Sequence, residues 1–241
     1  MKIAIVLTGH VRGWKNTYEN FKRYLIDPYD TDIYISTWNV THPGWHLEQK
    51  NVSDMNFMTI GINEVIDTYK PVEYHIENHD EFYKNRFPPI HNNGKDNDPL
   101  VVNKHHPTGY ENMWTWVERF RDQWYMVKKG GELIGNPKQY DLIMRIRFDL
   151  LVMNLPTLTP VKNMVVPSFY RHPPLGINDM MAYGSPEQMT HYFKLFDNLE
   201  KMYYEDNYDI SSSHHFLPLY LREYCNIVPD EVDIPLDILR G

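Results

Sequence analysis

The first 38 residues alternate between short apolar runs and a stretch with helical periodicity. Residues 2–7 are almost entirely apolar, which is typical of a strand buried on both faces, and residues 32–38 form a second strand-like run. Between them, apolar residues recur at helical spacing over residues 14–25. Strand, helix and strand in this order predict a βαβ unit, and therefore a parallel sheet with a right-handed crossover.

The same patterning continues through most of the chain. Further strands are expected at 71–77, 142–153, 164–167, in a short run ending at Gly184, and within 227–239. Helices are expected at 62–69, 80–87, 111–129, 186–204 and 213–222. Gly130 and Gly131 are expected to end the third of these helices. The predicted fold class is α/β: a Rossmann-like, mostly parallel central sheet flanked by helices, in a single domain over residues 1–241.

Residues 88–109 show no periodicity and are rich in Pro, His, Asn and Asp. Loops of this length without secondary structure are uncommon in compact domains. This segment is expected to be either a lid over a cleft or a partly disordered loop.

Composition narrows the functional classes. The chain is 42% apolar and 14% aromatic, which is enough for a large core, but no apolar run is long enough to span a membrane. The net charge is −8 and no basic run occurs, so nucleic acid is not an expected partner. The single cysteine, Cys225, excludes an intrachain disulfide and is typical of a reducing cytosol, so a cytoplasmic location is expected.

Charged residues interrupt the apolar run expected to form the central strand. Arg145, Arg147 and Asp149 alternate at period two, so they should project from one face where the strand runs out. Burying such charges without partners is costly. The pattern favours a strand end that opens into a polar cleft, where phosphates or a metal ion complete the charge balance. The alternative is a structural Arg–Asp ion pair at the edge of the sheet.

Other polar residues follow the first two predicted strands. Ligands of parallel sheets bind beyond the carboxyl ends of the strands, which places a set of residues at one rim: Thr8, Gly9, His10, Arg12, Thr37, Trp38 and Asn39. Gly9 would allow a ligand close to the backbone, and Arg12, near a helix start, suits a phosphate or carboxylate. Neither a GxGxxG motif nor a P-loop is present. An ordinary strand-to-helix turn explains the segment equally well.

The chain resembles the GT-A-fold nucleotide-sugar glycosyltransferases, particularly the small viral and bacterial type, in three places: Thr8-Gly-His-Val-Arg12, Tyr140-Asp141 followed by Arg145-Ile-Arg-Phe-Asp149, and Asn178-Asp179 with Gly184. The resemblance extends loosely over most of the chain. It implies an enzyme that moves a sugar from a nucleoside-diphosphate-sugar donor to a glycan or glycolipid acceptor, as in polysaccharide biosynthesis. It also implies a donor half over 1–153 and an acceptor half over 154–241.

One departure from that family concerns the metal. The family usually carries Asp-x-Asp at the end of the middle strand, whereas this chain has Arg147-Phe-Asp149. Two solutions are open. In the first, Asp149 with His214 or His215 holds Mn²⁺ or Mg²⁺, and the imidazole favours Mn²⁺. In the second, Arg145 and Arg147 take over part of the neutralisation of the diphosphate.

The resemblance also implies roles for individual residues. Seven of them are expected to bind the donor: Thr8, Gly9, His10, Arg12, Trp38, Arg145 and Arg147. Asp179 is expected to be the general base if the enzyme inverts the anomeric configuration, and to orient sugar hydroxyls if it retains it. An alternative without catalysis is a nucleotide- or sugar-binding module derived from a glycosyltransferase, which the missing second carboxylate favours.

Overall fold

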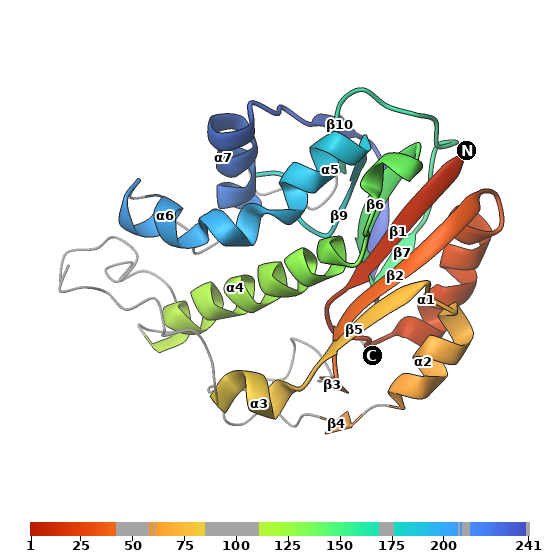
Figure 1. The fold of residues 1–241 in the computed structure, drawn as a ribbon, viewed down its shortest axis with the longest axis horizontal. Coiled ribbons are helices and arrows are strands. Elements are labelled where there is room, and N and C mark those ends of the chain that lie inside the picture. The colour runs from red at the N-terminus through yellow and green to blue at the C-terminus, as the bar shows by residue number, and fades with distance from the viewer. Residues whose placement is uncertain are drawn as a thin grey trace.

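The computed structural model describes residues 1–41, 58–59, 61–84, 111–168, 176–206, 208 and 213–239, and a seven-stranded sheet forms its centre (Figure 1). Its strands are, in spatial order, β10 (Asp230–Val232), β8 (Val165–Pro167), β9 (Met181–Gly184), β6 (Leu142–Arg147), β1 (Lys2–Thr8), β2 (Asp30–Trp38) and β5 (Glu73–Glu77). β1 pairs in parallel with β2 and β6, β2 with β5, and β8 with β10, whereas β9 is antiparallel to β6 and β8. The predicted α/β fold class with a Rossmann-like, mostly parallel sheet is confirmed.

Two small antiparallel pairs lie outside this sheet: β7 (Leu150–Val152) with β11 (Leu236–Ile238), and β3 (Val40–Thr41) with β4 (Met58–Thr59). The helices are α1 (Trp14–Phe21, continued by a π-helical turn Lys22–Ile26), α2 (Ile62–Tyr69), α3 (His79–Lys84), α4 (Glu111–Glu132), α5 (Pro186–Phe193), α6 (Leu199–Tyr204) and α7 (Ser213–Cys225). None of the helices in the described ranges is both long enough and apolar enough to cross a bilayer.

Helices cover both faces of the sheet, which explains why its central strands are apolar on both sides. Along β1, Ile3, Ile5 and Leu7 pack in the cluster that includes residues of α1 and α2. Ala4 and Val6 point the other way, into the cluster formed with α4, α5, α6 and α7. Period-two alternation therefore buries every residue of the run, as expected of a parallel strand between helical layers.

Strands of both predicted halves belong to one sheet. β8, β9 and β10 come from residues after 154, and β9 pairs directly with β6 from the first half. The predicted donor half and acceptor half therefore contribute strands to the same sheet.

The predicted end of the long helix is wrong. Gly130 and Gly131 lie inside α4, which continues to Glu132. Their lack of a side chain serves packing: a Cβ on Gly130 would lie 2.6 Å from Cγ1 of Val6, and one on Gly131 would lie 2.3 Å from Cγ of Phe193. The two glycines let α4 approach β1 and α5 closely. From the sequence alone, the same two glycines are interpreted as the end of the helix.

Three other element predictions are corrected. Residues 150–153 do not extend the central strand, because the chain turns after Arg147 and β7 pairs with β11. The helix expected over 186–204 breaks into α5, a 3-10 turn and α6. The tail expected as one strand forms β10 and β11, which belong to different sheets. The loop predicted at 88–109 lies outside the described residues.

We expect Gly131→Ala to lower the free energy of unfolding by about 1–3 kcal/mol, because the added methyl group must displace buried Phe193. The higher helix propensity of alanine offsets only about 1 kcal/mol of this. Urea titration followed by circular dichroism measures the change. The matched control is Gly135→Ala, where a Cβ meets nothing within 4 Å. Equal stability of the two variants would contradict the packing role of Gly131.

Candidate functional site

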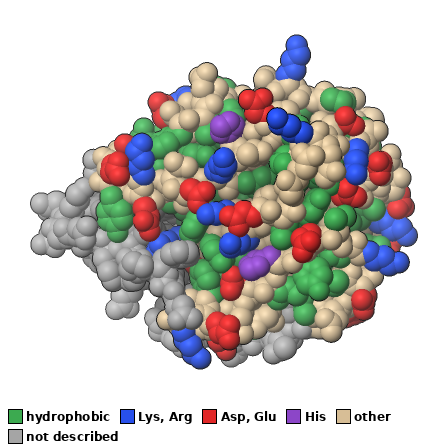
Figure 2. All heavy atoms as spheres, in the orientation of Figure 1, with side chains coloured by type: hydrophobic (Ala, Val, Ile, Leu, Met, Phe, Trp, Pro, Cys, Tyr) green, Lys and Arg blue, Asp and Glu red, His purple; other side chains and the backbone are tan. Residues whose placement is uncertain are grey.

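The topology brings the polar residues of several elements to one rim of the sheet. The carboxyl ends of β1, β2 and β6 lie at this rim because these strands are parallel. β9 runs the opposite way, so the residues just before it, including Asp179, reach the same rim. Figure 2 shows acidic and basic side chains interleaved across the middle of the surface in the view of Figure 1, with histidine beside them.

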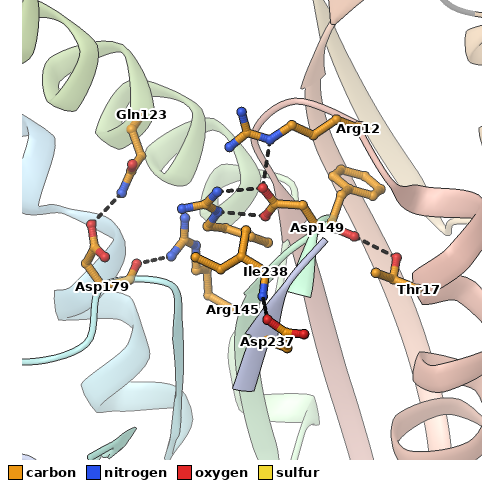
Figure 3. A network of polar contacts seen from close by, with 10 residues as sticks. Arg12, Thr17, Gln123, Arg145, Asp149, Asp179, Asp237 and Ile238 are labelled. Atoms are coloured by element: carbon orange, nitrogen blue, oxygen red, sulfur yellow. Dashed lines mark hydrogen bonds and ion pairs between the residues drawn. The ribbon is translucent and has the colours of Figure 1, made fainter. Parts of the chain in front are cut away.

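Arg12 lies beside Asp149 in Figure 3, and together with Arg147 they form the outer layer of this rim. Nε of Arg12 donates to Oδ2 of Asp149 at 2.7 Å. Arg147 donates from Nε to Oδ1 at 2.9 Å and from Nη2 to Oδ2 at 2.6 Å, which is a bidentate contact. The arginine side chains are 19% and 20% exposed, whereas that of Asp149 is 2% exposed. Two partly exposed arginine side chains therefore surround a buried carboxylate.

The charge state of Asp149 follows from this contact. Burial alone would raise the pKa of Asp149, but the positive charges of Arg147 and Arg12 and their hydrogen bonds hold it below the ordinary value. Asp149 is therefore ionised at neutral pH.

The backbone around Asp149 is held by two other parts of the chain. Oγ1 of Thr17 on α1 donates to the carbonyl of Phe148 at 2.6 Å, and the backbone N–H of Leu239 donates to the carbonyl of Asp149 at 2.8 Å. Gly13, at the start of α1, has a φ of 68°, and a Cβ there would lie 3.3 Å from the carbonyl oxygen of Leu239. Glycine therefore allows α1 and the segment after β11 to meet beside Asp149.

Arg145 forms an inner layer and is 1% exposed. Its Nε donates to Oγ1 of Thr8 at 2.9 Å, and its Nη1 donates to the backbone carbonyl of Asp179. Thr8 is also 1% exposed. The structure thus brings the two predicted donor-binding residues together, but it places them beneath the surface, where they connect β1, β6 and the segment before β9.

Asp179, the predicted general base, is a buried junction at 3% exposure. Its Oδ2 accepts hydrogen bonds from Nε2 of Gln123 on α4, at 3.0 Å, and from Oγ of Ser213 at the start of α7. Nε2 of His214 lies 3.5 Å from its Oδ1. Burial would raise the pKa of Asp179, but His214, these hydrogen bonds and Arg145 together lower it. A carboxylate so placed is suited to joining α4, α7 and β6.

Of the two candidate metal-ligating histidines, His214 lies against Asp179. Nδ1 of His214 is 2.8 Å from the carbonyl oxygen of Ile177, so this nitrogen carries the hydrogen and Nε2 faces Asp179. His215, the next residue, is exposed. The structure therefore pairs His214 with Asp179 and not with Asp149.

The donor set around Asp149 does not fit the predicted Mn²⁺ or Mg²⁺. A divalent cation needs carboxylate oxygens to bind it, and here both oxygens accept hydrogen bonds from positively charged guanidinium groups. Among the residues that the structure describes, no group of three or more His, Cys, Asp or Glu side chains is arranged to hold a metal ion.

The remaining predicted donor residues line the neighbouring part of the rim, after β1 and β2. Gly9 has a φ of 96°, and a Cβ there would meet none of the described residues within 4 Å, so these residues leave the backbone open at this position. Trp38 is 4% exposed and packs against His10, His79 and Phe82. Nδ1 of His10 lies 3.2 Å from the carbonyl oxygen of Val40. Trp38 therefore lies beneath this part of the rim, and Gly9 and His10 lie closer to its surface.

Sequence reasoning missed Gln123 and Thr17. Gln123 had a detectable signal, because it is a polar residue on the apolar stripe of the helix at 111–129, next to Phe120 and Val127 at helical spacing. Thr17 had none, because its partner Phe148 is 131 residues away in the chain.

No protein-family model matches the chain, and no curated protein sequence matches it. Among solved structures, it is similar to a glycosyltransferase involved in the glycosylation of the major capsid of PBCV-1, with a TM-score of 0.35 and 9% sequence identity. The likeness covers 97% of this chain and 81% of that one. At this TM-score it assigns neither a family nor an activity to the protein.

We expect Asp179→Asn to lower the free energy of unfolding by about 1–3 kcal/mol at pH 7, because charge-assisted hydrogen bonds to a buried carboxylate are lost. The folded state lowers the pKa of Asp179, so its stabilisation is present above the unfolded pKa of about 4 and is lost as the pH falls below it. Thermal unfolding between neutral and acid pH should therefore be less pH-dependent in the variant. Exposed Asp67 on α2 provides the control, Asp67→Asn. A variant as stable and as pH-dependent as the wild type would rule out the junction role.

Proposed function

We propose that this protein is a glycosyltransferase that moves a sugar from a nucleoside-diphosphate-sugar donor to a glycan or glycolipid acceptor. The observation that carries the proposal is the pair Arg12 and Arg147. They come from the carboxyl ends of the two central parallel strands, reach solvent, and share one buried carboxylate, Asp149. The rim of a parallel sheet is where such folds bind nucleotides and phosphates.

The charges at the rim suit a diphosphate. In the outer layer described above, Arg12 and Arg147 carry two positive charges against the single negative charge of Asp149. The N-terminus of α1, which begins at Trp14, adds partial positive charge next to Arg12. Guanidinium groups bind phosphate oxygens in a forked geometry, as Arg147 already binds the carboxylate of Asp149.

The proposed reaction places the growing charge against these groups. The bond between the anomeric carbon and the terminal phosphate oxygen of the donor breaks, and its electron pair stays on the nucleoside diphosphate. The oxygen of an acceptor hydroxyl bonds to the anomeric carbon, and its proton passes to the leaving phosphate or to solvent. Fixed positive charge beside the leaving phosphate lowers the barrier, because negative charge increases there in the transition state.

The other rim residues have supporting roles in this proposal. The backbone at Gly9, with His10 beside it, would line the donor side of the rim. Arg145 and Thr8 position the ends of β6 and β1. Asp179 positions α4 and α7, a role that its burial and the two hydrogen bonds accepted by its Oδ2 favour over proton abstraction.

We expect Arg12→Gln and Arg147→Gln each to weaken nucleoside diphosphate binding by roughly 10–100-fold, which corresponds to one charge-assisted contact of about 1.5–3 kcal/mol. Isothermal titration calorimetry with UDP, GDP, ADP and TDP measures the change and identifies the base that is bound. The matched control is Arg23→Gln, because Arg23 is exposed on the π-helical turn after α1 and stacks on Tyr24. Similar losses in the control and the rim variants would argue against the rim as the binding site.

Turnover distinguishes the enzyme from a binding module. Donor hydrolysis, or transfer to an acceptor, is expected with the sugar of the nucleotide that binds best. Binding without hydrolysis or transfer across a panel of donors and acceptors would indicate a non-catalytic nucleotide- or sugar-binding module. The burial of Asp179 and the two hydrogen bonds accepted by its Oδ2 are the observation that favours this second function.

A further inference from the structure

We infer that the donor diphosphate is bound without a divalent cation: Arg12 and Arg147 supply the positive charge, and Asp149 is their internal counter-ion and not a metal ligand. The inference rests on the proposed function, because it specifies how the same rim holds its donor.

The first step concerns the carboxylate itself. Three N–H groups from two guanidinium groups point at Asp149, at 2.7, 2.9 and 2.6 Å, and they engage both of its oxygens. Its side chain is only 2% exposed. A cation would have to replace these contacts at a position that solvent barely reaches.

The second step concerns repulsion. A metal ion bound to either oxygen of Asp149 would lie within a few ångströms of the guanidinium of Arg147, and Arg12 binds the same Oδ2. Two fixed positive charges therefore already occupy the space in which a metal-bridged diphosphate needs its cation.

The third step concerns the other ligands of a metal shell. Nδ1 of His214 is hydrogen-bonded to the carbonyl of Ile177, and its Nε2 faces Asp179. In Figure 3, Asp179 lies on one side of buried Arg145, and Arg12 and Asp149 lie on the other. The two carboxylates thus belong to separate networks, each with its own cationic partners. In this arrangement, Asp149 and His214 are not placed to bind the same metal ion.

The fourth step gives Asp149 a function. An incoming diphosphate and the carboxylate of Asp149 compete for the N–H groups of Arg12 and Arg147. In the donor-free protein, Asp149 fixes the orientation of both guanidinium groups and balances part of their charge. Removing its negative charge should therefore strengthen diphosphate binding, whereas removing a metal ligand would weaken it.

The direct test is calorimetric titration of the full chain with the four nucleoside diphosphates, in EDTA and then in Mn²⁺. We expect dissociation constants in the two conditions to agree within about threefold, a difference well below that of one charged contact. Binding seen only with Mn²⁺ would overturn the inference and leave the proposed function intact. Absence of binding in both conditions would remove the proposed function, and the inference with it.

Two substitutions sharpen the test. Asp149→Asn is expected to raise the affinity for the diphosphate in EDTA by about 3–10-fold. The reason is that the variant loses the negative charge that competes with the diphosphate for Arg12 and Arg147. A metal ligand would instead show loss of binding in Mn²⁺ after this substitution. Folding of the variant is checked by circular dichroism, because breaking a buried ion pair destabilises a protein.

If Asp149→Asn does not fold, Arg12→Gln gives the answer alone. In this variant, binding in EDTA should fall at least about 10-fold, and Mn²⁺ should not restore it. Restoration of wild-type affinity by Mn²⁺, or unchanged binding in EDTA, would overturn the assignment of Arg12. Arg23→Gln is again the matched control for the loss of a positive charge.

Discussion

The carboxylate of Asp149 between two arginines is the contact on which the rim depends. Arg12 belongs to the turn after β1 and Arg147 to the end of β6, so a single side chain joins the carboxyl ends of two neighbouring strands. Breaking a buried ion pair costs about 3–5 kcal/mol, a large share of the stability of a typical domain. The same contact that stabilises the turn also fixes the direction of the two partly exposed guanidinium groups.

Beneath this outer contact, a second network makes the rim rigid. Arg145 is buried between Thr8 and the backbone of Asp179, and Asp179 in turn holds α4 and α7 through Gln123 and Ser213. The energetic cost of burying these charges is offset only because each has several partners. The sheet end is therefore connected to the helices of one face by polar contacts, in addition to the apolar packing of the layers.

The sequence predicted features that depend on neighbouring residues. β1, β2 and α2 were recognised because their apolar periodicity is local, and the order of strand and helix implied parallel pairing. The contact between Arg12 and Asp149 could have been predicted from the sequence, because both residues follow strands that are parallel neighbours. The antiparallel direction of β9, and the depth at which Arg145 lies, could not be predicted, because they depend on the packing of segments far apart in the chain.

The closely packed glycines of α4 affect the position of Gln123, although they lie two turns away from it on the helix. Gly130 and Gly131 are in contact range of β1 and α5, two turns along the helix from Gln123. Gly130 sets how closely α4 approaches the sheet, and Gly131 sets how closely it approaches α5. Both distances affect how far the amide side chain of Gln123 must reach to meet Asp179. In evolutionary terms, selection on the rim would therefore extend to two positions that bear no functional group. Variation there would be limited by volume, although neither residue contacts the charged groups.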